Sequence, residues 1–169
     1  MGNLVEQNDF RDALRQQLTM LSLSEQALLL THYLIDNLDD DGYLRISLDD
    51  ILDNLAFSQQ LYVSEDELLE QLETLQSLEP IGVGARDLRE CLLMQIENKP
   101  SQTPYVQSAW KIVNAHLEDL GAHNYDHIKS TLRISNDELK HAIELITRLN
   151  PKPVGDNGVQ LYKNQNIIP

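Results

Sequence analysis

Cysteine is nearly absent from this 169-residue sequence, and the single one, Cys91, has no partner for an internal disulfide bond. A cysteine-based metal site would likewise lack its other sulfur ligands. Long apolar runs are absent too, since none approaches the roughly 20 residues that cross a bilayer. Residues 1–6 have neither the basic nor the apolar region of a secretory signal. We therefore expect a cytoplasmic protein without a membrane segment.

Basic residues are scarce: 13 lysines and arginines stand against 27 aspartates and glutamates, giving a net charge of −14. The imbalance lies in residues 1–99, which carry 20 acidic and 6 basic side chains, whereas residues 100–169 carry 7 of each. Nucleic-acid affinity normally depends on neutralising phosphates, so direct DNA binding by the acidic part is not expected. An acidic face is either a solvated surface or one that steers a basic protein partner.

Strand patterns are also lacking, because no alternation of apolar and polar residues persists for more than about four positions. Apolar residues recur instead at helical spacing. The sequence therefore predicts an all-α fold, with helices over residues 10–21, 27–38, 48–55, 65–78, 88–97, 104–121 and 125–132 and a last helix from residue 136. The segment 27–38 is apolar almost all round, which predicts the central helix of a first bundle.

Helix starts are marked by capping residues, whose side-chain oxygens accept a backbone N–H of the first turn. The predicted caps are Ser47, Ser64 and Ser135, together with Ser22 in a capping box with Glu25. A threonine followed by a proline, Thr103 and Pro104, predicts another start.

Residues 100–103 form the one polar, proline-flanked linker of any length, and the charge changes character there. We therefore expect two small helical subdomains, an acidic one over residues 8–99 and a second over residues 104–153 with a helix-turn-helix-like unit. An extended tail is expected over residues 154–169.

An internal similarity relates residues 63–68 to residues 134–139, and it continues to a proline after the last leucine, Pro80 in one copy and Pro151 in the other. Both copies begin after a short helical segment and a turn, as in a helix-turn-helix. They are either two similar helices that obey the same capping rules or two related three-helix units. The capped helix of the first copy is acidic, so a helix-turn-helix there would serve protein contact rather than DNA.

The stretch 79–88 separates two predicted helices and contains two glycines and a proline, so the backbone must turn there. We interpret it as a joint between helices or a partner-binding segment. The residues assigned to it are Pro80, Ile81, Gly82, Val83, Gly84, Arg86, Asp87, Arg89 and Glu90.

Two stretches imitate ligand-binding loops. The acidic turn Asp39, Asp40, Asp41 and Gly42 matches part of a calcium loop, but Leu48 stands where that loop needs a glutamate. The glycines of the joint resemble a dinucleotide loop, yet a helix rather than a strand precedes them. Neither stretch predicts a cofactor.

Histidines are the remaining candidate metal ligands. His123 and His127 lie four residues apart, with Asp126 beside them and His116 upstream. No further strong ligand follows in sequence, so the favoured interpretation is a polar surface, and no metal site is predicted. Likewise no serine or cysteine has a local base that would indicate covalent catalysis.

Residues 79–95 closely resemble the signature of the core-binding region of the enhancer-dependent, nitrogen-limitation class of bacterial sigma factors (sigma-N, sigma-fifty-four). Residues 37–44 and 149–153 resemble two further signatures of that region, in the family's order. The resemblance implies two helical subdomains that dock a sigma factor onto core RNA polymerase, with the β-subunit flap among the contacts. The mechanism that we expect is non-catalytic, with no cofactor and no metal.

The family's glutamine-rich activator-binding segment, its DNA-reading helix-turn-helix and its arginine-rich box have no counterpart in this sequence. Promoter DNA and the activator ATPase are therefore expected to be reached only through regions missing from this chain. Two other classes stay open: a free-standing helical protein-interaction or regulator module, and a metal-dependent hydrolase with scattered acidic residues.

Overall fold

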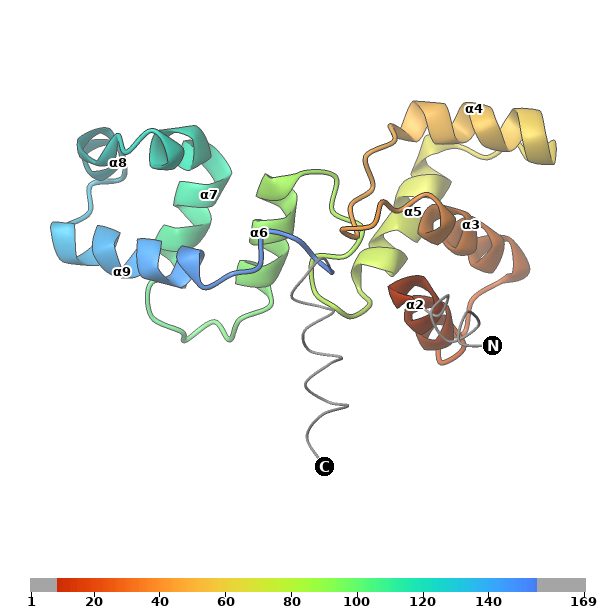
Figure 1. Cartoon of the computed structure of the whole chain (residues 1–169), viewed down its shortest axis with the longest axis horizontal. Coiled ribbons are helices and arrows are strands. Elements are labelled where there is room, and N and C mark those ends of the chain that lie inside the picture. Colours follow the sequence, from red (N-terminus) through yellow and green to blue (C-terminus); the bar gives the residue numbers. More distant parts are fainter. Residues whose placement is uncertain (1–8, 155–169) are drawn as a thin grey trace. The chain divides into compact units, whose positions relative to one another are not determined.

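A computed structural model describes residues 9–154, and within them the chain has eight α-helices and no strand (Figure 1). The all-α prediction is confirmed. No helix in this range is long and apolar enough to cross a membrane.

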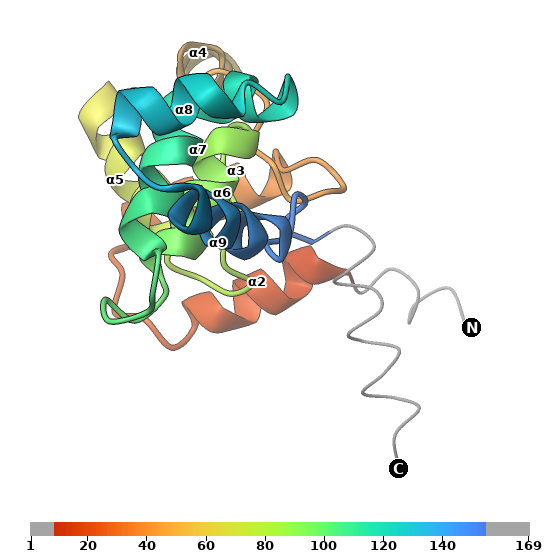
Figure 2. The same ribbon diagram turned by 90° about the vertical axis from the view of Figure 1, so that its left-hand side faces the viewer.

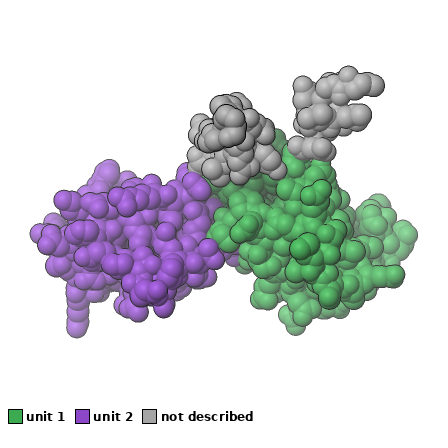
Figure 3. Space-filling view, turned by 90° about the horizontal axis from the view of Figure 1, so that it is seen from below, with its two compact units in different colours: residues 1–86, 152–169 green, residues 87–151 purple. Residues whose placement is uncertain are grey.

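The chain divides into two compact units, which Figure 3 colours separately. Unit 1 comprises residues 1–86 and 152–169, and unit 2 comprises residues 87–151. The sequence places the boundary at residues 100–103 instead. The difference arises because the helix before that linker packs on the helix after it, so the linker lies inside unit 2. The expected tail lies outside the described residues beyond Val154.

Unit 1 contains α2 (Phe10–Leu18), α3 (Glu25–Asp36), α4 (Leu48–Gln59) and α5 (Glu65–Gln76). Helix α3 packs against both α2 and α5, and α4 packs against α5. The central position of α3 agrees with its nearly uniform apolar character. The core is built of leucines and isoleucines on the inner stripes of these helices, among them Leu14, Leu18, Leu30, Leu34, Ile35, Ile51, Leu55, Leu68, Leu72 and Leu75.

Unit 2 contains α6 (Leu88–Glu97), α7 (Val106–Gly121), α8 (Tyr125–Leu132) and α9 (Asn136–Thr147). Helix α7 contacts all three others and is the centre of this unit (Figure 2). Its backbone departs from helical angles at His116 (φ −130°, ψ 26°), which kinks the helix. The core of unit 2 consists of Leu92, Ile96, Ala109, Ile112, Val113, Ile128, Leu139, Ala142 and Ile146.

The two units share an order of contacts. In each unit the first helix packs on the second, the second on the fourth and the third on the fourth. The four helices of unit 1, α2 to α5, therefore correspond in order to those of unit 2, α6 to α9. Helices α4 and α8 both end at a residue with left-handed backbone, Gln60 (φ 48°) and Arg133 (φ 58°). This correspondence favours two related units over two helices that merely share a cap.

A glutamine clamp repeats as well. The Gln17 side chain donates to the Glu79 carbonyl oxygen (2.6 Å) and accepts from the Glu79 amide (2.9 Å). In unit 2 the Gln95 side chain holds Asn150 in the same way, at 2.8 and 2.9 Å. Each clamped residue precedes the proline that the internal similarity pairs, Pro80 or Pro151.

Three predicted caps are confirmed, since Ser47, Ser64 and Ser135 each accept a backbone N–H at 3.1 Å. The capping box at Ser64 is complete, with the Glu67 side chain bonded back to the Ser64 backbone. At Ser135 the equivalent Glu138 carboxylate instead accepts the Ser108 hydroxyl of α7. A hydrogen bond between α7 and α9 thus takes the place of one of the two bonds of a capping box.

Other helix limits were predicted wrongly. Helix α2 ends at Leu18 rather than Leu21, and Ser24 rather than Ser22 caps α3, accepting the Ala27 amide at 3.1 Å. Helix α7 begins at Val106 after Tyr105, whose backbone is left-handed and whose side chain makes no capping bond. A turn at residues 101–105 therefore precedes α7, where the sequence predicted a helix start.

Candidate functional site

Parts of the three stretches that carry the family resemblance lie together in unit 1, the third through Pro153 and the adjoining Val154. The Gly84 amide donates to the Gly42 carbonyl oxygen, the Leu44 amide to the Ala85 carbonyl oxygen, and the Val154 amide to the Asp41 carbonyl oxygen, each at 2.9 Å. We call residues 39–44, 82–85 and 153–154 the loop junction. The first two of these hydrogen bonds join residues 42 and 41 apart in sequence, and the bond from Val154 to Asp41 joins residues 113 apart.

Two glycines allow the loops to approach so closely. Gly42 has φ +92°, and a Cβ atom there would lie 2.8 Å from Val154 Cγ2 and 3.2 Å from Pro153 Cβ. Gly84 has φ +83°, and its Cβ would lie 3.1 Å from two side-chain atoms of Leu75. Both the backbone angle and the space therefore require glycine at these positions.

The acidic turn is a structural part of the junction. The Asp39 Oδ1 atom accepts the amides of Asp41 and Tyr43, both at 2.9 Å, which fixes the turn. Each of the three carboxylates also has a cation within 4 Å: Arg45 near Asp39 at 3.4 Å, Arg11 near Asp40 at 3.5 Å and Lys152 near Asp41 at 3.9 Å. The Asp40 side chain nevertheless stays fully exposed to a partner.

The first part of the joint belongs to unit 1. Val83 is completely buried and its amide donates to the Pro80 carbonyl oxygen at 3.1 Å. Ile81 is half-buried, and Gly82 has φ +105°. The peptide bond between Glu79 and Pro80 is cis. These residues shape the turn, and Arg86, which is exposed, is the last residue of unit 1 before the division.

The second part of the joint starts α6 in unit 2. Asp87 caps this helix by accepting the Glu90 amide at 2.8 Å. Arg89 donates to the Val113 carbonyl oxygen (3.3 Å) and to a Glu118 carboxylate oxygen (3.0 Å), and thereby ties α6 to α7. The sequence leaves open whether this charged face locks the subdomains together or meets polymerase. The observed contacts of Arg89 lie within unit 2.

Two exposed aromatic residues were missed by the sequence reasoning. Phe57 near the end of α4 is 88% exposed, and Tyr62 in the following turn is 78% exposed. Asp53 lies one helical turn before Phe57 and is also exposed. The sequence could have indicated that Phe57 is exposed, because Phe57 lies off the inner stripe formed by Ile51 and Leu55.

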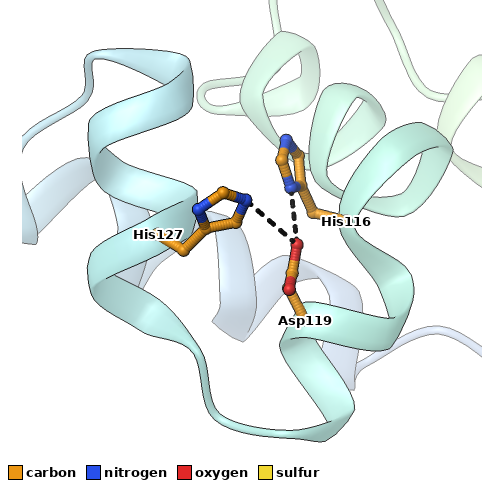
Figure 4. A group of neighbouring side chains, drawn as sticks. All are labelled: His116, Asp119 and His127. Carbon is orange, nitrogen blue, oxygen red and sulfur yellow. Dashed lines mark hydrogen bonds and ion pairs between the residues drawn. The ribbon is translucent and has the colours of Figure 1, made fainter.

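A side-chain cluster in unit 2 brings together His116 and Asp119 of α7 with His127 of α8 (Figure 4). Asp119 Oδ2 lies 2.9 Å from His116 Nδ1 and 3.8 Å from His127 Nε2. The hydrogen bond from His116, followed by one from Asn124, lowers the pKa of Asp119 below its ordinary value. The sequence reasoning considered Asp126 and missed Asp119.

His123, which the sequence pairs with His127, is not part of the cluster. Its backbone is left-handed (φ 62°), and its Nδ1 atom lies 2.7 Å from the Tyr125 hydroxyl. The spacing of four residues therefore does not bring His123 and His127 into one cluster. The spacing of three between His116 and Asp119 was the signal that could have found the cluster, because such residues are neighbours on a helix surface.

Comparison with known families identifies one match over residues 1–169, to the family described as "Sigma-54 factor, core binding domain". This match agrees with the resemblance that the three signature stretches carry.

Several curated proteins named RNA polymerase sigma-54 factor are similar to the chain. The one from Pseudomonas aeruginosa (strain UCBPP-PA14) is 39% identical over 153 residues, covering 90% of this chain and 30% of the relative. That from Acidithiobacillus ferridurans is 36% identical over 160 residues, covering 94% and 32%. That from Escherichia coli (strain K12) is 31% identical over 159 residues, covering 94% and 32%. The chain thus spans about a third of these relatives.

Proposed function

The chain belongs to the sigma-54 factor core-binding domain family, and from this premise we propose that it docks a sigma factor onto core RNA polymerase for transcription initiation. The family match over residues 1–169 is the observation that carries the proposal. No catalytic step, cofactor or membrane is part of it, and the place of action is the bacterial cytoplasm.

Charge supports a protein partner with basic surface. Residues 9–86 of unit 1 contain 16 acidic and 4 basic side chains, whereas residues 87–151 of unit 2 contain 9 and 7. An acidic surface of this kind accelerates encounter with a basic partner and discourages contact with phosphates. We assign the first approach to unit 1, with the exposed carboxylate of Asp40 among its charges.

Lasting affinity needs apolar contact, because charged groups at the rim of an interface contribute mainly to the rate of association. Aromatic side chains are frequent among the residues that dominate binding energy. Phe57 and Tyr62 are the most exposed aromatic residues among the large apolar side chains described, and both belong to unit 1. We assign them as anchors on polymerase, with the β-subunit flap as the proposed contact.

We assign promoter recognition to other regions of sigma-54 factors, because the acidic unit 1 offers little to a phosphate backbone. The response to an activator ATPase is assigned to other regions as well, on the family resemblance alone. A free-standing regulator module is not favoured, since the chain matches the core-binding family throughout.

The proposal is tested by titrating purified core RNA polymerase with the labelled chain and with two variants. Phe57→Ala is expected to raise the dissociation constant at least about tenfold, as truncation of an anchor does. Met20→Ala is the matched control, since Met20 is 85% exposed in the same unit but follows α2 and lies outside α4 and the turn after it. Its dissociation constant should stay within about twofold.

If Phe57→Ala and Met20→Ala raised the dissociation constant equally, Phe57 would not be an anchor. Failure of the unaltered chain to bind at all would remove the docking function itself. Circular dichroism of each variant verifies that the helices are intact.

A further inference from the structure

We propose that His116, Asp119 and His127 form a binding site for a divalent transition-metal ion, with zinc the best match to the ligand set. Two imidazole nitrogens and one carboxylate oxygen are ligands that zinc prefers, and a set of three protein ligands leaves a fourth position for water. Nothing in the docking function requires this cluster, so the site stands independently of it.

The distances between ligand atoms fit such a site. One potential ligand atom from each residue lies within 4.8 Å of the other two. Ligand atoms around a tetrahedral zinc ion, at bonds of about 2.0–2.2 Å, lie roughly 3.3 Å apart. The two separations from Asp119 Oδ2, 2.9 Å to His116 Nδ1 and 3.8 Å to His127 Nε2, fall on either side of that value. The remaining separation, between a ring nitrogen of His116 and one of His127, is within 4.8 Å, so the two side chains would draw together when an ion binds.

The local fold holds the three residues in place. His116 and Asp119 are one turn apart on α7, and His127 lies in the first turn of α8, which packs on α7. The connection between the two helices is fixed by a hydrogen bond from the Asn124 amide to the Asp119 carbonyl oxygen at 2.8 Å. Contact between elements, rather than a flexible loop, thus brings the third ligand to the other two.

Asp119 is oriented by a further partner. The Asn124 side chain donates to Asp119 Oδ1 at 3.3 Å, which leaves Oδ2 directed at the two histidine rings (Figure 4). Hydrogen bonds of this kind to the outer atom of a ligand are typical of metal sites, where they set the orientation of the ligand.

The exposed fraction of the side chains increases across the cluster from His116 to His127. The His116 side chain is 8% exposed, that of Asp119 26% and that of His127 62%. An ion would therefore rest against the core of unit 2 on one side and be open to water on the other. The open side provides an entry path and room for the water ligand.

The two histidines make unequal contacts with Asp119. The bond between His116 and Asp119 is an ordinary hydrogen bond, but His127 Nε2 is 3.8 Å from the carboxylate, beyond hydrogen-bond distance. The ring centres of His116 and His127 are 5.8 Å apart, in an edge-to-face arrangement. Both histidine ring nitrogens thus face the same carboxylate oxygen of Asp119 (Figure 4).

The test is isothermal titration calorimetry of the chain of residues 1–169 with zinc chloride at neutral pH. We expect one ion per chain. Removing a ligand by His127→Ala or Asp119→Asn should weaken binding at least about tenfold. His127 is largely exposed, so its substitution should leave the fold intact, which circular dichroism verifies. Cobalt(II) added to the unaltered chain should give the visible absorption of a tetrahedral site.

His123→Ala is the matched control, because His123 is an exposed histidine four residues from His127 and lies outside the cluster. It should bind zinc within about twofold of the unaltered chain. Absence of zinc binding by the unaltered chain would overturn the proposal. So would a loss of affinity in His123→Ala equal to that in His127→Ala, since His123, which lies outside the cluster, would then contribute as much as a proposed ligand.

Discussion

The glycines of the loop junction show how single residues permit the loops of unit 1 to meet. Both Gly42 and Gly84 have positive φ, and in both a Cβ atom would enter occupied space. The obstacle is more severe at Gly42, where the nearest atom is 2.8 Å away, than at Gly84, where it is 3.1 Å away. An L-residue in a left-handed conformation costs roughly 1–2 kcal/mol before any steric conflict.

We therefore predict that Gly42→Ala lowers the free energy of unfolding by about 2–3 kcal/mol, and Gly84→Ala by a similar or slightly smaller amount. The measurement is urea denaturation followed by circular dichroism. Gly121→Ala is the control, because Gly121 ends α7 without positive φ and has no atom within 4 Å of an added Cβ. Equal midpoints for Gly42→Ala and Gly121→Ala would show that the junction tolerates a side chain.

At the residue scale, sequence reasoning succeeded where the cause is local. Ser47, Ser64 and Ser135 were identified as caps because a cap needs only its own first turn. It failed where a local rule had two candidates, as for Ser22 and Ser24. It also failed where the partner lies far along the chain, as for Glu138, which bonds Ser108 instead of closing its capping box.

The glutamine clamps act at the scale of elements, because each fixes the loop after the fourth helix of a unit to the first helix of that unit. Gln17 of α2 holds Glu79, and Gln95 of α6 holds Asn150. Neither clamp was found from sequence. A glutamine on a helix surface has no distinguishing pattern, and its target lies 55 or 62 residues away.

We predict that Gln17→Ala lowers the free energy of unfolding by about 0.5–1.5 kcal/mol, the usual net value of a lost hydrogen bond, since both bonds are solvent-exposed. Gln16→Ala is the matched control, because Gln16 is the exposed neighbour on the same helix and its side chain makes no hydrogen bond among those described. Thermal melting of the two variants should separate them by a few degrees. A melting temperature for Gln17→Ala equal to that of Gln16→Ala would show that the clamp does not stabilise unit 1.

The positions of helices were largely predictable, because apolar residues at intervals of three and four identify a buried stripe. The grouping of the helices into two units could not be predicted in the same way. The linker over residues 100–103 has the polar, proline-flanked composition of a boundary, yet α6 and α7 on its two sides pack together. Packing across a loop depends on which stripes face each other, and composition does not report this.

At the scale of the whole molecule, the chain combines two units of similar construction with different charge. Both have a central second helix that packs on the first and the fourth. The surplus of acidic residues is concentrated in unit 1, and the histidine cluster belongs to unit 2. A shared architecture therefore carries two different surfaces, one acidic and one with the histidine cluster.

The resemblance of three short stretches to a sigma-factor family was visible in the sequence, and the family match over residues 1–169 agrees with it. Their spatial relation was not visible, because the loop junction is made by backbone hydrogen bonds between residues 41–44, 84–85 and 154. Backbone groups are the same in every residue, so no side-chain pattern reveals which of them pair.

The rate of association between the labelled chain and purified core RNA polymerase, measured by stopped flow at two ionic strengths, tests the docking proposal most directly. Acidic steering predicts that a complex forms at low salt and that added salt slows its association steeply while changing its dissociation little. Absence of a complex at low salt, with the helical circular dichroism spectrum intact, would contradict the proposal that this chain docks onto core polymerase.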